Sequence, residues 1–229
     1  LYSWNGRGDW EQRGSDIDGE AAGDSSGYSV SLSSDGSVVA IGTPFNDGNG
    51  GGAGHVRLYA WSDGNWLQRG SAIDGEAVGD GSGYSVSLSS DGLVVAIGAL
   101  GNDANGSGSG HVRLYSWNGR GDWEQRGSDI DGEAAGDQSG FAVSLSSDGR
   151  VVAIGANAND DSGDLAGHVR LYAVGGFDVF PEDRNESVDT DQDGIGNNAC
   201  LLYTSPEPTR PERIAFGRLR LKKKKLGGG

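Results

Sequence analysis

Apolar and polar residues alternate in short runs that recur along residues 1–174. In one copy, residues 54–61 and 66–73 alternate as the two strands of a hairpin would, and residues 84–88 alternate Tyr, Val and Leu with serines. Residues 94–98 are continuously apolar, which is typical of a strand covered on both faces. The pattern therefore predicts four strands in each repeat.

The hexapeptide Gly-His-Val-Arg-Leu-Tyr marks the repeat, because it begins at Gly54, Gly110 and Gly167, positions 56 and 57 residues apart. Four short strands with glycine-rich loops at this period, without helical periodicity, are typical of a propeller blade. Propellers close with about four to eight blades, and this chain has about three copies. We therefore predict an all-β fold over residues 1–174, a partial, open β-propeller of about three four-stranded blades with unpaired edges. The chain enters the repeat partway, which indicates a fragment.

Two short motifs in each copy carry a family resemblance. The first copy has Ser26-Gly27-Tyr28-Ser29-Val30 and then Val38-Val39-Ala40-Ile41-Gly42-Thr43-Pro44. Over residues 1–174 this resembles the FG-GAP repeat of integrin alpha-type propellers, with Ser-Gly in place of Phe-Gly and Gly-Thr-Pro in place of Gly-Ala-Pro. The resemblance implies an extracellular or cell-surface protein that serves adhesion or recognition.

The blades depart from that family in one loop. In FG-GAP repeats the loop between the first two strands often carries a calcium-binding Asp-x-Asp-x-Asp-Gly run. Here the loop shrinks to Ser34-Asp35-Gly36, Ser90-Asp91-Gly92 and Ser147-Asp148-Gly149. These runs have too few ligands for calcium and predict hairpin turns, so the resemblance does not imply calcium in the blades.

The chain before residue 201 is strongly acidic, since ten Arg and no Lys oppose 31 Asp and Glu, a net charge of −21. This charge opposes binding to nucleic acids or anionic membranes and suits divalent cations. No apolar stretch approaches the length needed to span a bilayer, and a single Cys gives no disulfide framework. We predict no nucleic-acid partner and no membrane insertion.

The most specific chemical signal is an acidic run within residues 175–199. Carboxylates at positions 1, 3 and 5, glycine at 6 and an apolar residue at 7 match the first half of an EF-hand-like loop. Its predicted calcium ligands are Asp189, Asp191, Asp193, Ile195 and Asn197. The run is similar to thrombospondin type 3 repeats, although Cys200 stands where that family has Asp. An acidic disordered linker is the alternative.

A second acidic segment recurs at residues 16–24, 72–80 and 129–137, with Ala72 in place of one Asp. Four closely spaced acids beside glycine could hold a cation. A solvated loop between blades is the more frequent role of such a segment, and we favour it.

Two catalytic or metal-binding patterns are weakened by comparing the copies. Gly23-Asp24-Ser25-Ser26-Gly27 matches a hydrolase Gly-x-Ser-x-Gly motif, but no helix is predicted after it, and other copies lack Ser25. His55, His111 and His168 occupy the same strand position in successive blades. We interpret these histidines as structural, because blade geometry would keep them apart.

Short surface motifs complete the candidates. Arg7-Gly8-Asp9 and Arg120-Gly121-Asp122 at hairpin tips resemble the adhesion tripeptide, but the middle copy lacks it, so a simple polar turn is the favoured interpretation. Asn105 and Asn185 fit the glycosylation sequon and matter only in a eukaryotic secretory protein.

Residues 200–229 differ abruptly from the rest of the chain. Cys200-Leu201-Leu202-Tyr203-Thr204-Ser205-Pro206 resembles a translated sequencing-library adapter, and the Lys and Gly runs that follow resemble homopolymer read-through. We interpret this tail as an artefact appended to a gene fragment. The alternative is a natural basic tail that folds back on the acidic blades.

These observations favour a non-enzymatic extracellular or cell-surface protein for adhesion or recognition, with an extracellular protein or glycan as ligand and a calcium-binding linker. The alternatives are a carbohydrate-binding or enzyme-associated propeller scaffold and a structural matrix protein. Catalysis would need a loop residue that breaks the repeat in one blade, and the copies suggest none.

Overall fold

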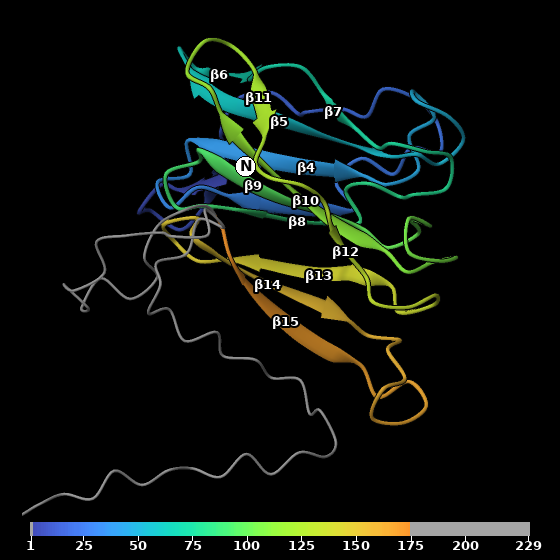
Figure 1. Cartoon of the computed structure of the whole chain (residues 1–229). Coiled ribbons are helices and arrows are strands. Elements are labelled where there is room, and N and C mark those ends of the chain that lie inside the picture. The colour runs from blue at the N-terminus through green and yellow to red at the C-terminus, as the bar shows by residue number, and fades with distance from the viewer. Residues whose placement is uncertain (1, 175–229) are drawn as a thin grey trace, which may run out of the picture. The chain divides into compact units, whose positions relative to one another are not determined.

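The computed structural model describes residues 2–174, which form fifteen strands in four antiparallel sheets (Figure 1). No helix that could cross a membrane occurs in this range. An N-terminal pair joins β1 (Tyr2–Trp4) to β2 (Trp10–Gln12). The first full sheet contains β3 (Ser29–Leu32), β4 (Val38–Thr43), β5 (His55–Ser62), β6 (Asn65–Gln68) and β7 (Ile73–Asp74). The second full sheet contains β8 (Ser85–Leu88), β9 (Val94–Ala99), β10 (His111–Trp117), β11 (Trp123–Gln125) and β12 (Ile130–Asp131). The last sheet contains β13 (Ser139–Leu145), β14 (Val151–Ala156) and β15 (His168–Ala173).

The predicted all-β fold, a partial, open β-propeller of about three four-stranded blades, is confirmed. The strand orders are β3-β4-β5-β6 and β8-β9-β10-β11 in the full sheets and β13-β14-β15 in the last sheet. The short strands β7 and β12 extend the full sheets by pairing with β5 and β10. The two domains predicted for residues 175–199 and 200–229 lie outside the described residues.

The sequence repeat and the sheet have different boundaries. Strand β5 opens the copy that begins at Gly54, yet it pairs along its length with β4 of the preceding copy. The single strand predicted for residues 66–73 is divided into β6 and β7, which both pair with β5. Each of the three larger sheets is therefore built from two neighbouring copies.

We call the first two strands of each larger sheet its inner strands: β3 and β4, β8 and β9, and β13 and β14. The hairpins that join them use the predicted Ser-Asp-Gly turns. In the first of them, the Ser33 hydroxyl donates to Asp35 at 2.7 Å and accepts the Val38 amide at 2.9 Å. Asp35 also accepts the Ser37 amide at 2.9 Å, and these bonds lower its pKa to about 2. The carboxylate is thus occupied by its own turn.

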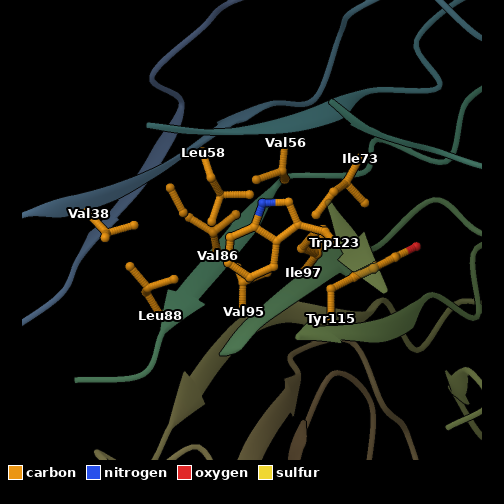
Figure 2. Packing of buried hydrophobic residues seen from close by; sticks show 11 residues of the cluster. Val38, Val56, Leu58, Ile73, Val86, Leu88, Val95, Ile97, Tyr115 and Trp123 are labelled. Atoms are coloured by element: carbon orange, nitrogen blue, oxygen red, sulfur yellow. The ribbon is translucent and has the colours of Figure 1, made fainter. Parts of the chain in front are cut away.

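Buried apolar side chains fill the space between consecutive sheets. Trp123 of β11 lies in the middle of one cluster, between Val56 and Leu58 of the first full sheet and Val95 and Ile97 of the second (Figure 2). A second cluster joins the other face of the second full sheet to the last sheet. The second full sheet is therefore covered on both faces, and each fully buried side chain of this size stabilises the fold by about 1.5–3 kcal/mol.

The inner strands of neighbouring sheets are joined by serine hydroxyls. Ser29 donates to the Gly83 carbonyl at 2.7 Å, and its counterpart Ser85 donates to the Gly140 carbonyl at 2.7 Å. The next hydroxyl of the strand, on Ser31, accepts the Leu88 amide at 2.9 Å. The serine face that sequence alternation predicts therefore connects one sheet to the next.

Tryptophans join the outer parts of the sheets. The Trp66 indole nitrogen donates to the Arg13 carbonyl at 2.9 Å, while the Arg13 guanidinium lies 4.5 Å from the Trp61 ring centre. Trp123 repeats this contact with the Arg69 carbonyl at 2.7 Å. The contact between the two full sheets thus has a polar inner seam and an aromatic outer seam.

Apolar positions that are buried in the middle of the array face solvent at its ends. On the inner strands, Val30 is 64 % exposed, whereas its counterpart Val86 is 9 % exposed. On the third strands, Leu171 is 70 % exposed, whereas its counterpart Leu114 is 2 % exposed. Within residues 2–174, apolar side chains are therefore uncovered on β3 and on the last sheet, whereas β4 is buried throughout, with Ile17 packed against its cluster.

Gly98 permits a close approach between the second full sheet and the last sheet, and its counterpart Gly155 in the next copy provides a matched control position. A Cβ added at Gly98 would overlap the Gly140 carbonyl oxygen, whereas one at Gly155 would meet only Ala142, at 3.6 Å. We expect Gly98→Ala to lower the free energy of unfolding by about 1–3 kcal/mol, because the second full sheet must shift away from the last sheet. Gly155→Ala should change it by less than about 0.5 kcal/mol.

Denaturant unfolding followed by tryptophan fluorescence and circular dichroism would measure both variants. Equal losses in the two variants would contradict the close-approach explanation.

Candidate functional site

A Glu–His–Arg cluster recurs where a connecting loop crosses to the next inner strand. In the second full sheet, His111 and Arg113 lie on β10, and Glu76 reaches them from the loop that follows β7. Arg113 donates to the Asp74 carbonyl at 2.7 Å, and its guanidinium lies 3.4 Å from the Glu76 carboxylate. Glycine at position 75 lets this loop pass close to the residues before β5, because a Cβ there would overlap the Ala53 carbonyl.

We call each such cluster a junction. The junction around His111 is the second, and the same cluster occurs around His55 at the first junction and around His168 at the third. Glu20 lies 3.3 Å from Arg57 and 3.9 Å from His55. Glu133 lies 3.6 Å from Arg170 and 3.5 Å from the third histidine. In each copy the glutamate precedes the histidine by 35 residues, a constant spacing that could have identified the pairing from the sequence.

The last aspartate of each acidic segment is buried. Asp24 accepts the Asn46 side-chain amide at 2.8 Å, and Asp80 accepts the Asn102 amide at 3.2 Å. Asp80 also accepts the Ala77 amide at 3.0 Å. The segment is an inter-blade loop as predicted, but the solvated interpretation is wrong for its buried aspartates, which fix the loop to the β4–β5 or β9–β10 connection.

The three histidines lie on different sheets, as the sequence predicts, on β5, β10 and β15. In the described residues, no potential metal cluster contains two of them. Burial lowers the pKa of both His55 and His111 below the ordinary value, with nearby arginines adding to the effect and carboxylates opposing it.

One carboxylate distinguishes the junctions from one another. Asp129 approaches His111 to 3.9 Å, whereas the equivalent position near His55 is Ala72. At the third junction the additional carboxylate is Asp161, whose counterparts in the other copies are Ala104 and Gly48. Comparison of the copies as sequence identified Ala72 as the departure at the first of these positions but missed Asp161, a loop carboxylate found in one copy only.

A row of aromatic rings runs across the starts of the inner strands. Tyr28 and Tyr84 have ring centres 4.8 Å apart, and Tyr84 and Phe141 have ring centres 5.7 Å apart. Phe45 meets Tyr28 edge-on at 6.0 Å. Tyr28, Phe45 and Phe141 are exposed, and interaction with the Tyr28 hydroxyl raises the pKa of Tyr84. We call Phe45, Tyr28, Tyr84 and Phe141 the aromatic row.

The remaining sequence candidates have structural partners or lack the required context. No helix follows Ser25, since β3 is the next element. Both Arg-Gly-Asp tripeptides are exposed, but Asp122 accepts the Ser71 amide of the preceding sheet at 3.1 Å. The Asn105 side-chain amide donates to the carbonyls of Gly132 and Glu133, so the sequon nitrogen is engaged in a loop contact.

The predicted calcium ligands lie outside the described residues. These are Asp189, Asp191, Asp193, Ile195 and Asn197. The second sequon, at Asn185, also falls in that part of the chain.

Comparisons with known proteins give distant structural likenesses only. No protein-family model and no curated protein matches the sequence. Hydrazine synthase of Kuenenia stuttgartiensis is similar with a TM-score of 0.41 and 16 % identity, over 63 % of this chain and 33 % of that one. Saccharomyces cerevisiae Sqt1 is similar with a TM-score of 0.39 and 13 % identity, over 66 % of this chain and 36 % of that one. A complex of KlAtg21 with the coiled coil of AgAtg16 is similar with a TM-score of 0.43 and 10 % identity, over 63 % and 39 %. The chain therefore spans between about a third and two fifths of the length of these structures.

The buried His55 makes the stability of the chain sensitive to acid. Its pKa is lowered mainly by burial and then by Arg57, against the opposing charges of Glu20, Asp74 and Asp24. The unfolded chain therefore binds a proton more readily, and the stabilisation is present above about pH 6.5 and is lost as the pH falls below it. We expect the melting temperature to fall between pH 7.5 and pH 5.5, and to fall less in His55→Gln.

Differential scanning calorimetry of both proteins would measure this difference. Identical pH profiles would contradict it, and circular dichroism at pH 7.5 would check that the variant is folded.

Proposed function

We propose that this chain is a non-enzymatic recognition module of an extracellular or cell-surface protein, serving adhesion or binding through its aromatic row. The single observation that supports this is the contact of four rings, three of them exposed, contributed by three consecutive sheets. Because the rings are held by rigid strands and turns, little side-chain freedom would be lost on binding.

A glycan is the ligand class that the aromatic row suits best. Aromatic faces stack against the apolar faces of sugar rings, and the Tyr28 and Tyr84 hydroxyls can exchange hydrogen bonds with sugar hydroxyls. The acidic surface of the blades opposes polyanionic partners, including nucleic acids. Neutral or cationic glycans are therefore favoured, and an extracellular protein with exposed sugar chains would present the same chemistry.

Binding to a glycan array, followed by titration of the best glycan, would test the proposal. We expect Tyr84→Ala to weaken binding at least tenfold, which corresponds to about 1.4 kcal/mol, because Tyr84 contacts two other rings of the row. Tyr2→Ala is the matched control, since Tyr2 is also exposed but lies outside the row.

Two outcomes would count against the proposal. One is the absence of binding to every glycan and extracellular-matrix protein presented. The other is equal weakening by Tyr84→Ala and Tyr2→Ala.

The acidic run in residues 175–199 adds a calcium-stiffened linker to the proposed module. Its carboxylates at alternate positions supply oxygen ligands suited to calcium. We expect calorimetric titration to detect a calcium site that is lost in the double variant Asp191→Asn/Asp193→Asn and kept in Asp63→Asn. Asp63 is an exposed turn carboxylate of the blades and serves as the control. Calcium binding that is unchanged in the double variant would contradict this assignment.

A further inference from the structure

We propose that Glu76, His111 and Asp129 bind a divalent transition-metal ion of the zinc class. Their ligand atoms, one from each side chain, all lie within 4.8 Å of one another. His111 Nδ1 is 3.8 Å from Glu76 Oε2 and 3.9 Å from Asp129 Oδ2. These separations are too long for hydrogen bonds, whereas ligands about 2.0–2.2 Å from a tetrahedral ion stand roughly 3.4 Å apart. A small contraction would complete the site.

The His111 side chain itself points to a missing partner. It is 1 % exposed, and its Nδ1 atom is buried without a hydrogen-bond partner although it faces two carboxylates. A buried nitrogen in this state costs free energy unless something binds it. Burial also lowers the pKa of this imidazole, which favours the neutral, metal-binding form.

Both carboxylates are oriented by a second contact that leaves the ligating oxygen free. Gln125 donates to Asp129 Oδ1 at 2.6 Å, so that Oδ2 faces the histidine. Arg113 lies 3.4 Å from Glu76 Oε1, so that Oε2 faces the histidine. Such outer contacts typically fix the geometry of metal ligands.

The ligand set selects the class of ion. One imidazole nitrogen and two carboxylate oxygens suit zinc and similar ions better than calcium or magnesium, which prefer oxygen alone. The two carboxylates bring charge that a divalent ion would neutralise. Asp129 and Glu76 are 27 % and 43 % exposed, so an ion could enter from solvent and retain water as a further ligand.

The first junction supplies an internal control. There His55 faces Glu20 at 3.9 Å, but Ala72 stands where the Asp129 carboxylate would be. This junction has two of the three ligands and should not hold the ion. Replacing Ala72 by Asp should create a second site of the same kind.

Zinc titration calorimetry, with cobalt absorption spectra as a second readout, would test the proposal on the full chain. The background protein for all variants is His168→Asn, which lacks the histidine of the third junction. Excess calcium is present in every titration so that sites with oxygen ligands alone are already occupied. We expect one zinc per chain, at least tenfold weaker binding in Asp129→Ala, and two zincs per chain when Ala72→Asp is added. Asp131→Ala, which removes a nearby exposed carboxylate outside the cluster, should bind like the background.

Three results would overturn the proposal. They are no zinc binding by the background protein, equal binding by Asp129→Ala and Asp131→Ala, and a single zinc after addition of Ala72→Asp. Circular dichroism of each variant separates loss of ligands from loss of fold.

Discussion

The fold depends on the close approach of inner strands from neighbouring sheets. At Gly42 and Gly98 a carbonyl of the next sheet occupies the place where a side chain would begin, and a serine hydroxyl of the neighbouring paired strand donates to that carbonyl. The spacing set at this seam brings Trp123 and its aliphatic neighbours into van der Waals contact farther out. Because the contact joins different sheets, no single sheet can satisfy its own polar groups or bury its own apolar face.

The same dependence explains the charged residues at the junctions. The third strand of each larger sheet carries an arginine and a histidine, buried on β5 and β10 and half-buried on β15. They need a carboxylate, and the connecting loop supplies it as Glu20, Glu76 or Glu133. Buried charges are tolerated when paired and hydrogen-bonded, as the bond from Arg113 to the Asp74 carbonyl illustrates. The acidic composition is therefore partly structural, although many carboxylates remain at the surface.

Local sequence features predicted the strands and turns well. The continuously apolar run of residues 94–98 is buried on both faces, and the Ser-Asp-Gly turns are hairpins. The sequence did not predict which strands share a sheet. Alternating apolar and polar residues indicate which face of a strand is buried, but not which strands it pairs with. The junction clusters were missed because each pairs residues 35 positions apart on different elements, and because a buried aspartate such as Asp80 has the same local sequence as a solvated one.

The uncovered apolar side chains of β3 and of the last sheet have a consequence for how the array unfolds. Strands β4 and β9 are buried throughout, whereas alternate residues of β14 in the last sheet are only half-buried because no sheet within residues 2–174 covers its outer face. In arrays whose units are stabilised by their neighbours, opening begins at the ends and proceeds inward. Amide protection should therefore be graded along residues 2–174 and greatest in the second full sheet, which would persist as the final ordered unit during unfolding.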